Sequence, residues 1–288
     1  MSVFTITGRD KEDFKEFFSQ DSFECIGQKG YYTIGATEDE DFVAGVLQFF
    51  IDEDYIEGFT AKITYLFVGE EFRGQGIGTI LVNEFKDVVS NSNIDIMTVE
   101  VFENASEELR KIFEDNGFNP VGERAYYCMP LLNLCKKPAI KTAAIGACRS
   151  VEELTGPEIT SFFNGISPAI LQNGLKDYDL KTSSFSDTDD GKCLLLIKEE
   201  EEDVLETAFM YASEGCENML VSLLSFSANR AKELYGPACK LQIACSKPME
   251  YDLVSKLGTE LTADKYTIYK SERKDTSSDI GTDTSEQV

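Results

Sequence analysis

Histidine is absent from the 288 residues of the chain. Its absence removes the usual general base, the commonest metal ligand and every catalytic triad that depends on an imidazole. Any chemistry must therefore use carboxylates, tyrosine, cysteine, serine, backbone amides or water. We accordingly expect no metal site.

The eight cysteines include no Cys-x-x-Cys pair and are scattered along the chain. This usage is typical of reduced thiols in a cytoplasmic protein, and not of a disulfide framework or a zinc knuckle. The N-terminus lacks a basic region followed by an apolar run, so no signal peptide is expected. No apolar run approaches the roughly 20 residues of a membrane helix. We therefore predict a cytoplasmic protein without a membrane partner.

Basic residues are few, since 27 lysines and arginines stand against 52 acidic residues, a net charge of −25. Such a field repels phosphate backbones, so we expect no nucleic-acid partner. One explanation of the acidic excess is solubility. A more specific explanation is a cationic amine substrate, attracted by the same field.

The length of 288 residues and a hydrophobic fraction of 42 % suffice for two domains with buried cores. The first half is expected to hold a short strand, a helix that follows Asp10, and three further strands. These elements are expected over residues 4–7, 11–18, 31–36, 42–51 and 59–68.

A glycine-rich loop joins the last of these strands to a segment with helical apolar spacing that runs to Ser90. Gly74, Gly76 and Gly78 fall within five positions, which lets the backbone approach a ligand closely. The N-terminus of the following helix presents unpaired N–H groups and a partial positive charge. Residues 73–79, named the cradle below, are therefore predicted to bind a pyrophosphate. A tight turn without a ligand is the alternative.

The run Arg73-Gly74-Gln75-Gly76-Ile77-Gly78 resembles the Arg/Gln-x-x-Gly-x-Gly/Ala signature of the GNAT superfamily of N-acetyltransferases. It fits neither a P-loop nor a dinucleotide-binding fingerprint. A strand over 95–102, a helix ending at Gly117, and a last strand over 121–131 follow in the order of that family. The resemblance implies an α+β or α/β chain with the GNAT fold, a mixed central sheet flanked by helices.

The resemblance also implies acetyl-CoA as the cosubstrate, held by the cradle and by the end of the preceding strand. The cofactor-binding residues that it indicates are Phe67, Val68, Arg73, Gly74, Gln75, Gly76, Ile77, Gly78, Thr79 and Asn104. Asn104 is further expected to form a capping box with Glu107 at the start of the next helix.

The catalytic residues are less obvious. GNAT enzymes often use a tyrosine four residues before a Gly-Phe dipeptide as the acid, and here that position is Phe113. We therefore take Tyr127 as the candidate acid and Glu57 as the candidate base. The alternatives are a half-buried packing residue for Tyr127 and a solvated loop charge for Glu57.

The second half resembles a worn copy of the first. A polar loop is expected there, followed by four strands, over residues 177–192, 193–198, 204–212, 218–225 and 240–245. Residues 225–230 align with the cradle and contain no glycine, which predicts that this half has lost the pyrophosphate site. An unrelated α/β domain is the alternative.

These patterns predict a GNAT domain, a linker, a degenerate GNAT-like domain and a disordered tail, over residues 1–134, 135–142, 143–270 and 271–288. The predicted function is transfer of an acetyl group from acetyl-CoA to a primary amine of a small cationic molecule or peptide. A non-catalytic acyl-CoA-binding or interaction module is the alternative. Aminoacyl transfer is disfavoured, because an anionic surface suits tRNA poorly. The oligomeric state stays open.

Overall fold

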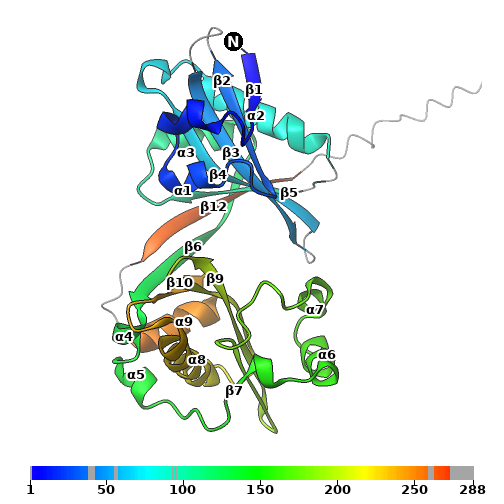
Figure 1. The fold of residues 1–288 in the computed structure, drawn as a ribbon, viewed down its shortest axis with the longest axis vertical. Helices are drawn as coiled ribbons and strands as arrows, with labels where there is room; N and C mark the ends of the chain where they lie inside the picture. Colours follow the sequence, from blue (N-terminus) through cyan, green and yellow to red (C-terminus); the bar gives the residue numbers. More distant parts are fainter. Residues whose placement is uncertain are drawn as a thin grey trace, which may run out of the picture. The chain divides into compact units, whose positions relative to one another are not determined.

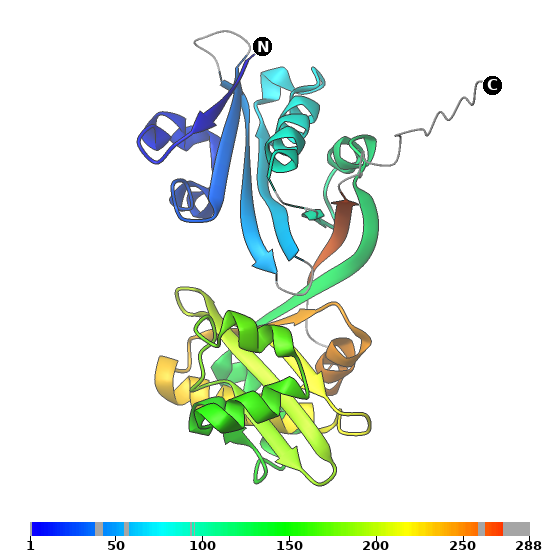
Figure 2. The same cartoon turned by 90° about the vertical axis from the view of Figure 1, so that its right-hand side faces the viewer.

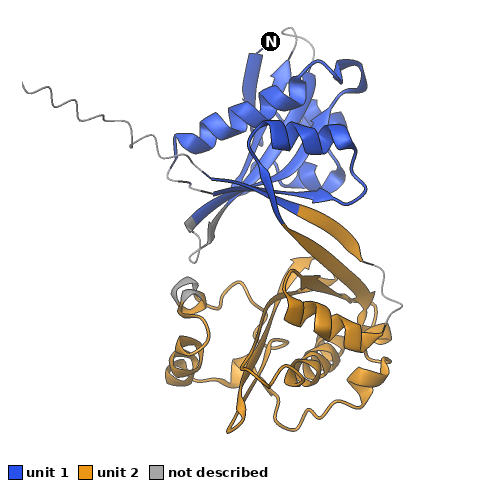
Figure 3. Cartoon of the chain, turned by 180° about the vertical axis from the view of Figure 1, so that it is seen from behind, with its two compact units in different colours: residues 1–121, 268–288 blue, residues 122–267 orange. Residues whose placement is uncertain are grey.

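The computed structural model describes residues 2–37, 43–54, 58–92, 94, 96–258 and 263–272. The chain divides into two compact units, shown in Figure 3: unit 1 is residues 1–121 with 268–288, and unit 2 is residues 122–267. Strands β6 (Asn119–Pro130) and β12 (Asp264–Glu272) cross this division, so each contributes to both units.

The sheet of unit 1 is mixed. Five strands lie wholly in this unit: β1 (Ser2–Ile6), β2 (Tyr31–Thr37), β3 (Val43–Asp54), β4 (Gly58–Val68) and β5 (Ile96–Phe102) (Figure 1). They are hydrogen-bonded in this order, and β12 follows β5. The pairs from β1 to β4 are antiparallel, whereas β4 and β5 are parallel. The predicted mixed sheet is thus confirmed.

Helices cover both faces of this sheet. They are the segments η1 (Lys11–Phe17), α1 (Gln20–Glu24), η2 (Glu70–Phe72), α2 (Ile77–Ser90) and α3 (Glu107–Asp115). Figure 2 shows η1 and α1, in dark blue, and α2, in cyan, on opposite sides of the strands. The apolar spacing of α2 buries Ile77, Leu81 and Phe85 in the larger core of the unit. Phe14 and Phe17 of η1 pack with Val46 in a smaller core on the other face.

The strands β4 and β5 part inside unit 1. Their parallel pairing ends at Ile63 opposite Val99. The next residue, Thr64, has no partner on β3 because the register shifts there, which is a β-bulge. Strand β4 continues beyond the bulge to Val68, still paired with β3. We call the point at which these parallel strands part the first fork.

Unit 2 contains the remaining strands of the sheet, with helices on both of their faces (Figure 1). Its strands, besides β6, are β7 (Arg149–Ser150), β8 (Ser184–Thr188), β9 (Gly191–Glu201), β10 (Val204–Ala212) and β11 (Lys240–Cys245), in the order β6-β11-β10-β9-β8-β7. Its helical segments are α4 (Leu131–Leu134), α5 (Pro138–Lys141), η3 (Val151–Glu153), α6 (Gly156–Asn164), α7 (Pro168–Asn173), α8 (Met219–Tyr235) and α9 (Pro248–Leu257). Helices α8 and α9 share one core with the sheet, and α6 and α7 share another.

The series β9-β10-α8-β11-α9-β12 repeats the series β3-β4-α2-β5-α3-β6. Strands β10 and β11 are parallel up to Thr207 opposite Ile243, and Ala208 is then left unmatched against β9. This second fork therefore repeats the first, including its bulge. The predicted tandem architecture is confirmed by this topology.

The last strand of each repeat extends into the unit built by the other repeat. Residues 125–130 of β6 pair with β11 in unit 2, and residues 268–272 of β12 belong to unit 1. Tyr269 of β12 is 2 % exposed in the larger core of unit 1, and its hydroxyl donates to Glu114 Oε1 at 3.1 Å.

Three predictions for the second half are wrong. Helix α8 begins after its N-cap Asn218 and includes the rest of residues 218–225, which were predicted as a strand. It also includes residues 225–230, which were aligned with the cradle. The loop equivalent to the cradle is instead 213–218, between β10 and α8. The predicted polar loop over 177–192 contains β8 and the start of β9, because buried serines make that strand look polar.

The compact units differ in their boundaries from the predicted domains 1–134 and 143–270, because the exchanged strands move the division into β6 and β12. The predicted linker 135–142 includes α5, whose Ile140 is 2 % exposed in the core of unit 2. The predicted domain boundaries stay a prediction. Of the predicted tail, residues 271 and 272 belong to β12, and the remainder lies outside the described residues.

Candidate functional site

A cavity of about 710 Å³ lies in unit 1 where β4 runs through the cradle into α2. Eight of the ten predicted cofactor-binding residues line it: Phe67, Val68, Arg73, Gly74, Gly76, Ile77, Gly78 and Thr79. Its opposite wall is the start of α3, with Ser106, Glu108, Leu109 and Ile112. The structure thus places one continuous sequence motif around a single cavity, while the binding role of these residues stays a prediction.

The positions in the cradle require glycine for two different structural reasons. Gly74 and Gly76 have φ values of +77° and +82°, and a Cβ built on either would meet nothing within 4 Å. Their positive φ favours glycine, and the open space beside them is part of the cavity. Gly78 instead packs closely, because a Cβ there would lie 2.8 Å from Ile112 Cδ1 of α3.

The first turn of α2 offers unpaired backbone donors to this cavity. Gly76 is its N-cap and supplies no side-chain cap. The first intrahelical bond runs from the amide of Ile80 to the carbonyl of Gly76, at 3.0 Å. The amides of residues 77–79 therefore lack intrahelical acceptors. No acidic residue lies in this first turn, so the helix dipole and its amides favour an anion.

Two side chains brace the loop that leads into α2. The Nε of Arg73 donates to the carbonyl of Val68 at 3.2 Å, and the Arg73 guanidinium lies 3.9 Å from Glu70. Gln75 does not line the cavity; its amide donates to the carbonyl of Glu71 at 2.9 Å. Gln75 thus shapes the loop rather than the cavity wall.

The prediction for Asn104 is wrong in its helix cap. The N-cap of α3 is Ser106, whose hydroxyl accepts from the amide of Leu109 at 3.3 Å. Asn104 is exposed and does not belong to the cavity lining. Glu108 lines the opposite wall of the cavity. Its carboxylate accepts hydrogen bonds from the backbone amide of Glu108 and from the Ser106 side chain, and these lower the pKa of Glu108. The sequence analysis missed this wall of the cavity, although the helical spacing of Leu109 and Ile112 signals an inward face.

Only one of the two predicted catalytic residues, Tyr127, lies within the described residues. Glu57 lies outside the described residues. Tyr127 is on the part of β6 that belongs to unit 2, opposite Ile243, and its ring packs against the core of that unit. Phe113, at the position of the family's tyrosine, is 2 % exposed and packs edge-on against Phe118. The catalytic assignments of Glu57 and Tyr127 therefore stay predictions.

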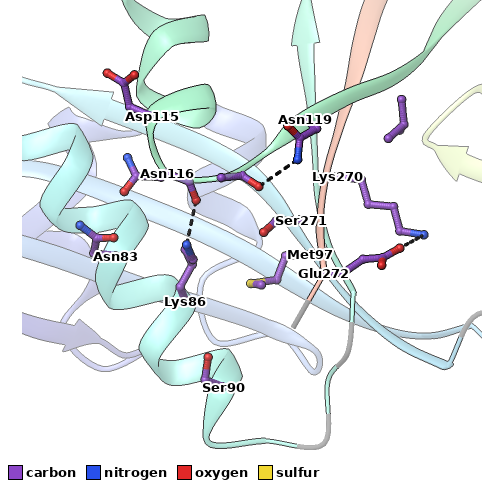
Figure 4. Close-up of a pocket in the computed structure, with 12 residues that line it drawn as sticks. Asn83, Lys86, Ser90, Met97, Asp115, Asn116, Asn119, Lys270, Ser271 and Glu272 are labelled. Atoms are coloured by element: carbon purple, nitrogen blue, oxygen red, sulfur yellow. Dashed lines mark hydrogen bonds and ion pairs between the residues drawn. The ribbon is translucent and has the colours of Figure 1, made fainter. Parts of the chain in front are cut away.

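A larger cavity of about 960 Å³ lies at the other end of α2, beside the C-terminus of α3 and the end of β12 (Figure 4). Some of its polar groups are bonded to one another: Lys86 Nζ donates to the carbonyl of Asn116 at 2.8 Å, and Lys270 lies 3.4 Å from Glu272. None of the predicted site residues lines it. Size alone therefore does not select the functional site.

Residues 3–127 match the family model described as the acetyltransferase (GNAT) domain. The match spans the whole of the cradle and the fork. The chain contains a GNAT acetyltransferase domain. For residues 3–127 the resemblance to the GNAT family, the fold class and the assignment to the acyltransferases are thereby confirmed.

Solved structures with the same fold cover almost the whole chain. A GCN5-related N-acetyltransferase from Sphaerobacter thermophilus is 13 % identical, with a TM-score of 0.58 over 91 % of this chain and 85 % of its own. A tandem GNAT protein of the clavulanic acid pathway is 12 % identical, with a TM-score of 0.54 over 94 % and 98 %.

A glucosamine N-acetyltransferase region in a fungal multi-domain β-N-acetylglucosaminidase is 12 % identical, with a TM-score of 0.71 over 94 % of this chain and 38 % of that one. At such low identities these likenesses show the fold alone. A search of curated proteins found no match to the sequence.

The loop of the second repeat that is equivalent to the cradle has one positive-φ glycine with open space beside it, Gly215, where the cradle has two. Its equivalent loop, residues 213–218, contains Glu214 and Glu217. The amide of Gly215 donates to the carboxylate of Glu217 at 3.2 Å, so an internal anion already takes that donor. The loss of the pyrophosphate site stays a prediction; the alignment on which it was based is replaced by this loop, in which one amide already has an internal acceptor.

Within the described part of the chain, no group of three or more acidic or cysteine side chains is placed to hold a metal ion. In the same residues no helix has the length and apolar character needed to cross a membrane.

Proposed function

We propose that the chain transfers an acetyl group from acetyl-CoA to a primary amine on a small cationic molecule or peptide. The observation that carries the proposal is the cradle, in which positive-φ glycines and the open amides of α2 line one cavity. The cavity fits the donor, because a pyrophosphate needs close backbone approach and several N–H donors.

Each part of the site has a separate task in this proposal. The amides of residues 77–79 hold the pyrophosphate, and the edge of β4 beyond Ile63 is free of pairing with β5. Backbone groups on that edge can bind an extended amide chain as a further strand would. The pantetheine arm of CoA is such a chain, and it would carry the thioester toward the fork.

The acceptor is inferred from charge. A net charge of −25 raises the local concentration of cations at the surface. Glu57 is proposed as the base and Tyr127 as the acid for the departing thiolate.

The free cysteines fit the reducing cytoplasm. Burial raises the pKa of Cys193 to about 11 and that of Cys245 to about 12, so neither offers a thiolate at neutral pH. A covalent acyl-thiol route through either of these two thiols is therefore disfavoured.

One observation favours the non-catalytic alternative. Phe113 has no hydroxyl and is buried, so the family's usual acid is missing from its position. An acyl-CoA-binding or interaction module would tolerate that loss.

Calorimetric titration of acetyl-CoA into the wild type and into Gly76→Glu tests the cradle. We expect binding by the wild type and none by the variant, because the new carboxylate enters the cavity. A thiol-release assay with amines then separates the two functions: transfer supports the enzyme, and binding with background turnover supports the module. Absence of wild-type binding would refute both.

A further inference from the structure

The cavity at the C-terminal end of α2 has no part in the proposed function. Its volume is about 960 Å³, and it lies between the C-terminal parts of α2 and α3 and the end of β12 (Figure 4). The described residues that line it all belong to unit 1. Sites for small molecules span about 300–1,000 Å³, so this cavity has the size of a ligand site.

Lys86 of α2 brings to this cavity an ammonium group that has no carboxylate partner. It is half-buried, and its Nζ donates to the carbonyl of Asn116 at 2.8 Å. Among the residues that the structure describes, no acidic side chain forms an ion pair with it. An ammonium group has three donors and a full positive charge, whereas the Asn116 carbonyl accepts one hydrogen bond and carries no net charge. Two donors and the charge therefore remain for a ligand.

Ser271 of β12 adds a buried hydroxyl to the same cavity. The residue is 7 % exposed, and within the described part of the chain its hydroxyl has no hydrogen-bond partner. Buried polar groups in native structures are nearly always hydrogen-bonded. Figure 4 shows Ser271 and Lys86 around the same space, although they come from different elements. The pair therefore marks a position for an oxygen atom that accepts from both.

The rest of the lining suits a small organic molecule. Asn83 of α2 contributes an amide that no described residue binds, and such an amide can donate to an oxygen atom. Met97 of β5, which is 3 % exposed, and Val121 of β6 supply apolar surface. The cavity therefore offers donors for an anionic group and apolar side chains for a carbon skeleton.

The charges of the cavity select a monoanion. Lys270 lies 3.4 Å from Glu272, so Lys86 is the remaining cation of the described lining. Asp115 lines the cavity as well, and α3 ends there with the partial negative charge of its dipole. One cation among these negative groups balances a single negative charge, and the two charges of a phosphate would be repelled. A carboxylate has the single charge and two oxygens that accept hydrogen bonds.

We propose that this cavity is a binding site for a small organic monocarboxylate, separate from the predicted acetyl-CoA site. Lys86 Nζ and the Ser271 hydroxyl donate to the carboxylate, and the carbon skeleton lies against Met97 and Val121. Helices α2 and α3 line both cavities, so the two sites lie at opposite ends of the same helix pair. The inference goes beyond the proposed function and does not depend on it.

Met97 provides a direct probe of this site. The six methionines of the full chain are labelled with ¹³C-methyl groups and followed by NMR during a titration with benzoate at constant ionic strength. Met97→Leu assigns the Met97 signal. We expect that signal to shift and to saturate. Benzamide, a neutral analogue of the same shape, and inorganic phosphate should bind about tenfold more weakly or worse, because they lack the charge or carry too much of it.

Two variants and a matched control locate the carboxylate. Lys86→Met should raise the Kd of benzoate by about tenfold or more, because it removes a hydrogen bond to a charged group. Ser271→Ala should raise it by about two- to tenfold, without lowering Tm, since the hydroxyl has no described partner to lose. Lys111→Met removes an exposed lysine of α3 that does not line the cavity, and it should keep the wild-type Kd.

Absence of a saturable Met97 shift in the wild type would overturn the inference. So would equal affinities for benzoate and benzamide, or a wild-type Kd in both Lys86→Met and Ser271→Ala, which would leave Lys86 as a helix cap only. Equal weakening by Lys86→Met and Lys111→Met would show an effect of overall charge and would also overturn it.

Gly76→Glu separates this site from the cradle. We expect the variant to keep the wild-type Kd for benzoate, because Gly76 lines the other cavity. Loss of the Met97 shift in this variant would place the carboxylate in the cradle and refute the inference. No acetyl-CoA is used in these titrations, so a failure of the proposed function leaves their outcome unchanged.

Discussion

Replacing Gly76 by alanine separates the backbone requirement of the cradle from its ligand requirement. A non-glycine residue at φ +82° costs about 1–2 kcal/mol of strain. The lower entropy of the unfolded chain offsets about 0.4–1 kcal/mol of this cost. With nothing within 4 Å of the new methyl group, no clash adds to it. We expect a net loss of about 1 kcal/mol in the free energy of unfolding, a fall in Tm of about 2–4 °C.

The effect on acetyl-CoA binding should be larger. Gly76 lines the cavity, so its methyl group would occupy space that the pyrophosphate needs and push it from an amide donor. A hydrogen bond to a charged group contributes about 1.5–3 kcal/mol, which corresponds to an increase of about 10- to 150-fold in Kd. Calorimetric titration of acetyl-CoA measures this change directly.

Gly215→Ala is the control for strain. Gly215 has φ +83°, and a Cβ there also meets nothing within 4 Å, but it belongs to the loop of the second repeat. This variant should lose the same stability and keep the wild-type Kd. Equal Kd values for the wild type and Gly76→Ala would refute the cradle. Equal weakening by both variants would show that strain, and not the cavity, controls binding.

Three further predictions follow from packing and charge. Phe113→Ala should lower the free energy of unfolding by about 3–5 kcal/mol in denaturant titration, because a 2 % exposed ring leaves a cavity against Phe118. Burial raises the pKa of Glu206 in the folded state. The free energy of unfolding of the wild type, relative to that of Glu206→Gln, should therefore fall as the pH rises from about 4.3, the pKa of an unfolded glutamate, through the raised pKa of the folded state. A difference that does not change over this pH range would contradict the prediction. A fragment of residues 1–134 lacks Tyr269 and its strand, and should show less cooperative unfolding by circular dichroism than the full chain.

The cradle was predictable because its determinants are local. Glycines at two positive-φ positions, a strand before them and an amphipathic helix after them are all read within about twenty residues. The first fork was not predictable in the same way. Its placement depends on the register between β4 and β5, and no local pattern shows where parallel strands part.

The second half was misread because its buried elements are rich in serine. Ser225 and Ser227 of α8 are buried, and their hydroxyls bond to the carbonyl of Ile140 and to Ser184 Oγ, both at 2.8 Å. Such hydrogen bonds satisfy polar groups inside a core. The same serines lower the hydropathy of the segment, so its burial is not visible in the sequence. The apolar run before Ser225 is short enough to fit a strand or a helix, and only the length of α8 decides between them.

The two repeats show which features of this fold depend on a few residues. The fork and its bulge arise from strand pairing and alternating burial, and they are present in both units although the sequences there differ. The cradle depends on a few glycines and on the absence of nearby anions, and one carboxylate, Glu217, suffices to take an amide in the second loop. Each unit nevertheless holds a strand of the other repeat, including the buried Tyr269. The second repeat therefore contributes to the fold of the unit that contains the cradle, because its last strand completes the core of that unit.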